Sequence, residues 1–145
     1  MGLYPTFDLP KMTAPKGSRT TDYKEAPYFD FEVGDFVLDG AHRPTRANGK
    51  EAFCQWCLKV CATERRTKLA YSDAIGVEIQ KAAKECKDIA ALQSAIERTI
   101  TEAILVNPAA ELVKDFSFKY EGDHLWVTFT VVSTPYGEET LRVAY

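Results

Sequence analysis

Three cysteines recur within eight residues and are the first candidates for chemistry. Cys54, Cys57 and Cys61 form a C-x2-C-x3-C pattern, and Cys86 could supply a fourth thiolate. Such spacing can hold zinc, but structural zinc sites usually take paired ligands from turns rather than from a helix face. Because free cysteine packs as a small apolar side chain, we expect core packing. A metal-binding or redox-regulated adaptor is the alternative, and disulfides are not expected.

No other residues form a catalytic pattern in the sequence. His42 and His124 stand in a predicted loop and turn, without an acid or serine at a telling spacing, and we expect both to be exposed. Glu64 and Asp73 could serve as the two carboxyl groups of a glycosidase, but a chain with 21 acidic residues offers many such pairs. The sequence predicts no enzyme and no cofactor, and a peptidoglycan hydrolase is the least favoured alternative.

Residues 63–76, TERRTKLAYSDAIG, are here called the charged loop. A plain linker would be rich in Gly, Ser, Asn or Pro, whereas this segment combines charges with Leu69 and Tyr71. Arginine and tyrosine often anchor protein interfaces, which makes Arg65 and Tyr71 candidate partner-binding residues. On residue types alone, docking to a partner and bracing within the fold are equally open.

Length and composition favour one soluble globular domain. The 145 residues are 46% hydrophobic and 27% charged, which is ordinary for such a domain. A net charge of −3 argues against binding to nucleic acid, and no apolar run is long enough to span a membrane. The first residues do not resemble a secretory signal. Gly2 and Thr6 match the short myristoylation pattern, but no polybasic stretch supports it.

The first part of the chain is predicted to be an extended arm. Residues 1–28 hold four of the seven prolines and show neither a helical nor a strand period. Residues 29–145 then form a single domain. It begins with a short hairpin, in which Phe29, Phe31 and Val33 alternate with acids before a turn at Gly34.

Three helices follow the hairpin. Asn48 is predicted to cap the first, with Glu51 reaching back as in a capping box, and an apolar face runs from Phe53 to Cys61. Ser72 or Asp73 is predicted to cap the second helix. Asp88 is predicted to cap the third, which Asn107 and Pro108 end.

From Leu112 the hydrophobic period changes to two, which predicts three strands separated by turns at 121–123 and 135–137. Leu141, Val143 and Tyr145 fall on one side of the last strand. Helices grouped apart from an antiparallel sheet indicate an α+β fold. If the last strand lies at a sheet edge, these apolar residues make it a second candidate partner-binding surface.

The order of several segments resembles a family of small baseplate proteins from the contractile tails of phages, prophages and tailocins. These segments are LYPTFDLP, FDFEVGDFVLDG, TERRTKLAYSDAIGVEI and DFSFKYEGDHLWVTFTV. The chain is similar, from Leu3 to Val131, to the baseplate wedge protein that initiates the sheath, and the most specific part runs from Thr63 to Gly76. Some relatives carry a lysozyme-like label, but no matching catalytic pair is present here.

The resemblance implies a structural, non-catalytic role. In the broader sheath-initiator family a Glu-Pro-Arg stretch contacts the wedge scaffold, and here Glu64 and Arg65 match it without the proline. The resemblance also implies that sheath subunits dock by strand exchange, for which the last strand would be suited. Expected partners are wedge proteins and sheath subunits. The isolated protein would be a monomer or weak oligomer, with six-fold assembly in the baseplate, first in the bacterial cytoplasm and then in the tail particle.

Overall fold

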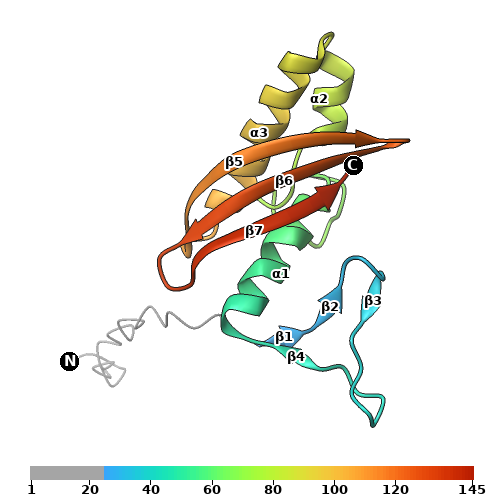
Figure 1. The fold of residues 1–145 in the computed structure, drawn as a ribbon, viewed down its shortest axis with the longest axis vertical. Helices are drawn as coiled ribbons and strands as arrows, with labels where there is room; N and C mark the ends of the chain where they lie inside the picture. The colour runs from blue at the N-terminus through green and yellow to red at the C-terminus, as the bar shows by residue number, and fades with distance from the viewer. Residues whose placement is uncertain (1–24) are drawn as a thin grey trace, which may run out of the picture.

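The computed structural model describes residues 25–145 (Figure 1). Most of the predicted arm, together with the Gly2 and Thr6 pattern, lies outside the described residues. Within them the fold is α+β, as predicted, with three helices, a three-stranded antiparallel sheet and two very short strand pairs.

The sheet consists of β5 (Ala110–Glu121), β6 (His124–Ser133) and β7 (Gly137–Ala144), in the order β5-β6-β7. All neighbours are antiparallel, and β7 lies at one edge, as its predicted role requires. The pairing of β5 with β6 shifts between Lys114 and Ser117, where Asp115 adopts a φ of 57°. This irregularity lies in the long, curved strand β5.

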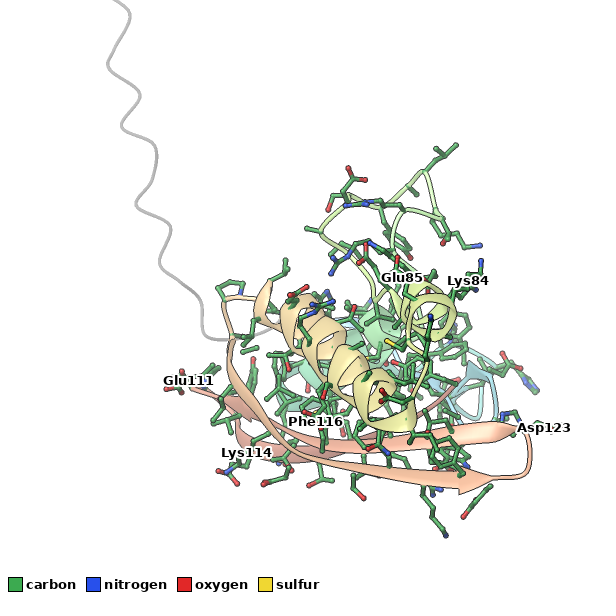
Figure 2. All side chains as sticks on the ribbon, turned by 90° about the horizontal axis from the view of Figure 1, so that it is seen from above. Lys84, Glu85, Glu111, Lys114, Phe116 and Asp123 are labelled. Atoms are coloured by element: carbon green, nitrogen blue, oxygen red, sulfur yellow. The ribbon has the colours of Figure 1, made fainter. Side chains whose placement is uncertain are left out.

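All three helices lie on one side of the sheet (Figures 1 and 2). Helices α1 (Gly49–Cys61) and α3 (Ile89–Leu105) pack against it, and the short α2 (Ile79–Glu85) packs on α3. In Figure 2, Phe116 points from the sheet toward the helices, whereas Lys114 points to the opposite side. The core lies between these two layers, and its largest fully buried side chains include Phe53, Ile96, Ile100, Ile104 and Phe129.

Two predicted helix starts differ from the structure. Asn48 does occupy the N-cap position of α1, but its side chain makes no capping hydrogen bond, so the capping box was wrong. Gly49 adopts a φ of 52°, and the chain therefore enters the helix through a different turn. The third helix is capped as predicted, because the Asp88 carboxylate accepts a hydrogen bond from the Ala91 amide at 2.7 Å.

The second helix begins at Ile79 rather than after Ser72 or Asp73. Gly76 has a φ of 107°, and Val77 is extended beside Glu64 in an isolated parallel bridge. Backbone hydrogen bonds between Val77 and the segment after α1 thus keep the residues before Ile79 out of the helix, although the local sequence would allow them to be helical.

A small module precedes α1. Strand β1 (Ala26–Pro27) pairs with β4 (Arg46–Ala47), and β2 (Phe29–Asp30) pairs with β3 (Asp35–Phe36). The predicted hairpin is therefore present, but its strands are short. The Asp30 carboxylate accepts hydrogen bonds from the amides of Glu32 and Val33, at 2.8 and 3.1 Å, and this local turn ends β2.

Candidate functional site

The charged loop is closed by its own backbone. The Arg65 amide donates to the Val77 carbonyl at 2.8 Å, and the Val77 amide donates to the Thr63 carbonyl at 2.9 Å. The Arg65 side chain adds a third bond, from Nε to the Gly76 carbonyl at 3.2 Å. Arg65 therefore braces the loop, and the residues between Arg65 and Gly76 project from this closed base.

The tip of the charged loop presents its apolar side chains to solvent. Leu69 is fully exposed, and Tyr71 is 38% exposed. The Tyr71 ring lies 5.2 Å from the Lys59 ammonium at the end of α1, a cation–π contact that orients the ring. Glu64 is half-buried. The structure thus places Glu64, Arg65 and Tyr71 in one loop and gives Arg65 an internal contact, in line with the bracing alternative.

Strand β7 turns its apolar side chains inward. Leu141 and Val143 are 8% exposed and belong to the core. The half-buried Tyr145 donates its hydroxyl to the Cys61 carbonyl, at 3.1 Å, which ties the sheet to the end of α1. These three side chains therefore hold β7 in place, and the open side of the strand offers its backbone.

The register of β7 shows which backbone groups are open. Leu125 and Tyr145 exchange two hydrogen bonds, at 2.9 and 3.0 Å. Because hydrogen-bonded and non-bonded pairs alternate in an antiparallel ladder, the pairs Thr128–Arg142 and Thr130–Thr140 are non-bonded. The N–H and C=O groups of Thr140 and Arg142 consequently point away from β6, toward the open edge.

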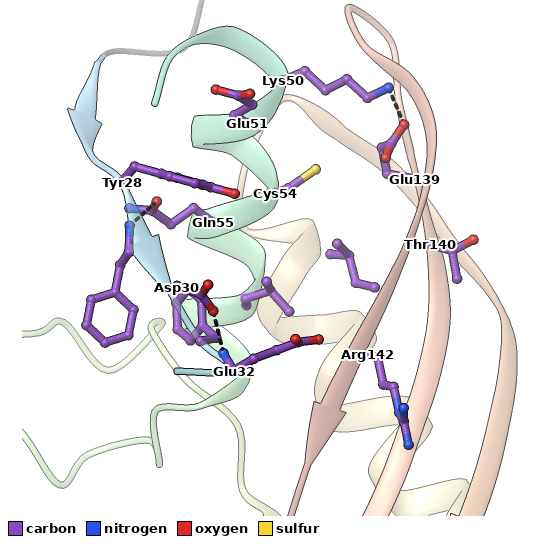
Figure 3. A pocket seen from close by; sticks show the side chains of 14 residues that line it. Tyr28, Asp30, Glu32, Lys50, Glu51, Cys54, Gln55, Glu139, Thr140 and Arg142 are labelled. Atoms are coloured by element: carbon purple, nitrogen blue, oxygen red, sulfur yellow. Dashed lines mark hydrogen bonds and ion pairs between the residues drawn. The ribbon is translucent and has the colours of Figure 1, made fainter. Parts of the chain in front are cut away.

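A groove of about 610 Å³ runs beside that edge (Figure 3). Its walls are β7 and residues 28–32 of the N-terminal module, and α1 forms its floor. Lys50 of α1 forms an ion pair with Glu139 of β7 across one end. Gln55 holds the opposite wall, because its side chain accepts from the Phe29 amide at 3.0 Å and donates to the Pro27 carbonyl at 2.7 Å.

Sequence reasoning missed Gln55 and the groove. Gln55 lies within the helix whose apolar face was predicted, and its partners are backbone groups 26 and 28 residues away. No residue type marks such partners. The only signal was a long amide side chain beside an apolar helix face.

The cysteines divide into two environments. Cys57 and Cys61 are buried in the core, as the core-packing prediction requires, whereas Cys54 and Cys86 are half-buried. Burial raises the pKa of the Cys57 thiol and raises that of Cys61 to about 12. Within residues 25–145, no three His, Cys, Asp or Glu side chains gather as metal ligands would. Both histidines, His42 and His124, are exposed.

These features describe a small α+β protein with an exposed loop tip and an open sheet edge. In the same part of the chain, no helix has the length and apolar character of a membrane span. The chain belongs to the contractile injection system sheath initiator family, whose model matches residues 27–137. A search of curated proteins finds no match.

The family match confirms the resemblance noted from the sequence and places the protein among components of phage or phage-like tails. It includes the N-terminal module from Pro27 onward, all three helices and the charged loop. Strand β7 lies beyond the matched residues except for Gly137, its first residue.

Proposed function

We propose that this protein is a non-catalytic structural component of the baseplate of a contractile phage tail or phage-like tail. It binds wedge proteins, offers the first ring of sheath subunits a template, and needs no cofactor. The family match over residues 27–137 carries this proposal. The protein would assemble in the bacterial cytoplasm, take six-fold positions in the baseplate, and remain in the finished particle.

The charged loop is the proposed wedge-binding surface. Its exposed Leu69 and Tyr71 provide apolar contact area, and the half-buried Glu64 lines the same surface hollow as Tyr71. A mixed surface of this kind suits an interface that must also be soluble before assembly. Arg65 supports the contact by holding the base of the loop through the Gly76 carbonyl.

The open edge of β7 is the proposed surface for sheath subunits. Its unpaired backbone groups at Thr140 and Arg142 can accept a further strand. This contact is supported from within the fold by three side chains that fix the strand against the core and α1, those of Leu141, Val143 and Tyr145. In this way the strand completes its own sheet and remains available on one side.

An affinity pull-down tests the proposal directly. Tagged protein is recovered gently from its native host after the tail genes are induced, and co-purifying proteins are identified by mass spectrometry. We expect wedge and sheath subunits. Recovery of the bait alone, from cells shown to be making tails, would contradict the proposed function.

A further inference from the structure

The groove beside β7 carries a charge pattern as well as an open edge. We propose that it selects an extended segment whose groove-facing side chains include both apolar residues and lysine or arginine. This inference rests on the proposed docking of sheath subunits at β7 and specifies the chemistry of the segment that docks. The occupant is identified by three properties of the groove, namely its backbone edge, its floor and its rim.

The backbone edge sets the conformation of the occupant. A segment paired with Thr140 and Arg142 must itself be extended, because each exchanges hydrogen bonds only with a strand at ladder spacing. Such a strand would extend the sheet β5-β6-β7 on the side of β7 that faces the groove. It would therefore lie over α1, which forms the floor there (Figure 3).

The floor selects apolar side chains on one side of the occupant. Leu58 and Cys54 of α1 are half-buried and pack at the margin of the core, and Phe29 and Phe31 line the opposite wall. The two phenylalanine rings make an edge-to-face contact with centroids 5.0 Å apart. Because alternate side chains of a strand point the same way, every second residue of the occupant would face this surface, and the residues between would point to the other face of the sheet, as Thr140 and Arg142 do.

The rim selects basic side chains among the positions of the occupant that face the groove. The groove is lined by the carboxylates of Asp30, Glu32, Glu51 and Glu139 and by the cations of Lys50 and Arg142. Both cations are already engaged. Lys50 pairs with Glu139, and Arg142 lies 3.8 Å from the Trp126 ring centroid and 3.9 Å from the Glu121 carboxylate.

Two of the carboxylates are available to an occupant. Glu32 and Glu51 are exposed, and within residues 25–145 neither side chain makes an ion pair or hydrogen bond. In Figure 3 the Glu32 carboxylate points from the hairpin into the groove. Lysine and arginine can lay their aliphatic stems along apolar surface while the charged ends reach such carboxylates. The rim is thus complementary to a basic strand and repels an acidic one.

Three synthetic twelve-residue peptides test this selection by fluorescence anisotropy with the purified full chain. They carry serine at every second position, and at the positions between, valine alternates with lysine, serine or glutamate. We expect the lysine peptide to bind at least about tenfold more tightly than the glutamate peptide at low salt, and the difference to shrink as salt is added. Equal affinity for all three would overturn the selection while leaving strand docking intact.

Charge-reversal variants locate the selection. Glu32→Lys with Glu51→Lys should invert the peptide preference. Glu85→Lys with Glu102→Lys, which makes the same change in net charge at exposed sites on α2 and α3, should leave it unchanged. If the control pair inverted the preference equally, net charge rather than the groove would be responsible, and the proposal would fail.

Thr140→Pro tests the edge itself. Proline removes the open N–H of Thr140, which does not bond to β6, so the fold should persist while binding of every peptide is lost. Undiminished binding by a folded variant would move the site away from β7. If no peptide bound even the unaltered protein, the groove would not be a strand site. The proposed function would still be tested separately, by recovery of wedge and sheath proteins in the pull-down.

Discussion

At Gly76 the backbone passes so close to the start of the charged loop that only glycine fits. A Cβ at this position would lie 2.6 Å from the Thr63 carbonyl oxygen and 3.0 Å from the Arg65 nitrogen, and the φ is 107°. We expect Gly76→Ala to lower the free energy of unfolding by at least about 2 kcal/mol, from left-handed strain plus the clash. Denaturant unfolding measures this. Gly34→Ala is the matched control, because Gly34 also has a positive φ but open space around it.

The Cys61 thiol links stability to pH. Burial raises its pKa to about 12, so between the unfolded value near 8.5 and pH 12 the folded state holds a proton that the unfolded state has lost. Its contribution is therefore complete below about pH 8.5 and declines as pH rises, by about 1.4 kcal/mol per pH unit. Cys61→Ala should flatten the fall in unfolding free energy above pH 9. An unchanged slope in this variant would contradict the assignment.

Glu64 and Arg65 differ in what they do, although the sequence set them side by side. We expect Glu64→Ala to keep the thermal midpoint while lowering wedge recovery in the pull-down. Arg65→Ala should lower the free energy of unfolding by about 1 kcal/mol, because it removes the bond to the Gly76 carbonyl.

The double variant, Glu64→Ala with Arg65→Ala, should remain folded and fail to assemble tails. Arg66→Ala, at an exposed neighbouring arginine 3.8 Å from Glu78, is the control. Normal assembly by the double variant would make the pair incidental.

At the scale of elements, Gln55 joins the N-terminal module to α1. From the middle of the helix its side chain makes two hydrogen bonds, one with the Pro27 carbonyl and one with the Phe29 amide. Gln55→Ala should destabilise this attachment by about 1–3 kcal/mol and leave the sheet and α3 unaffected. Hydrogen exchange at the Phe29 amide measures the effect. Gln80→Ala on exposed α2 should not change that exchange, and an unaltered Phe29 amide in Gln55→Ala would show that other contacts hold the module.

The elements differ in how far their sequence predicted them. Helix α3 and the three-stranded sheet follow from strong local patterns, a capping Asp88 and a clear period of two after Leu112. The start of α2 did not follow from its local pattern, because hydrogen bonds between Val77 and residues 63–65 override the capping chemistry of Ser72 and Asp73. Of the candidate site, the charged loop and the edge strand were indicated by residue types. The groove and Gln55 depend on contacts between distant segments.

For the whole molecule, the proposed wedge surface and the groove lie on different elements, so they can be impaired separately. Leu69 is fully exposed at the tip of the charged loop. We expect Leu69→Asp to keep the thermal midpoint and to reduce wedge recovery in the pull-down at least about tenfold, because it places a charge in an apolar contact. Ile89→Asp, at another exposed apolar residue, should recover wedge proteins normally. Full recovery with Leu69→Asp would exclude the loop tip from the contact.

The bond between Tyr145 and the Cys61 carbonyl also has a mechanical consequence. A strand docked on β7 and pulled along its own length would load its hydrogen bonds in shear, so that they share the force instead of opening one after another. The Tyr145 hydroxyl then passes part of that force from the end of β7 into α1, at 3.1 Å, and from there into the core. A sheet edge tied in this way is suited to remain attached while a contracting tail pulls on it.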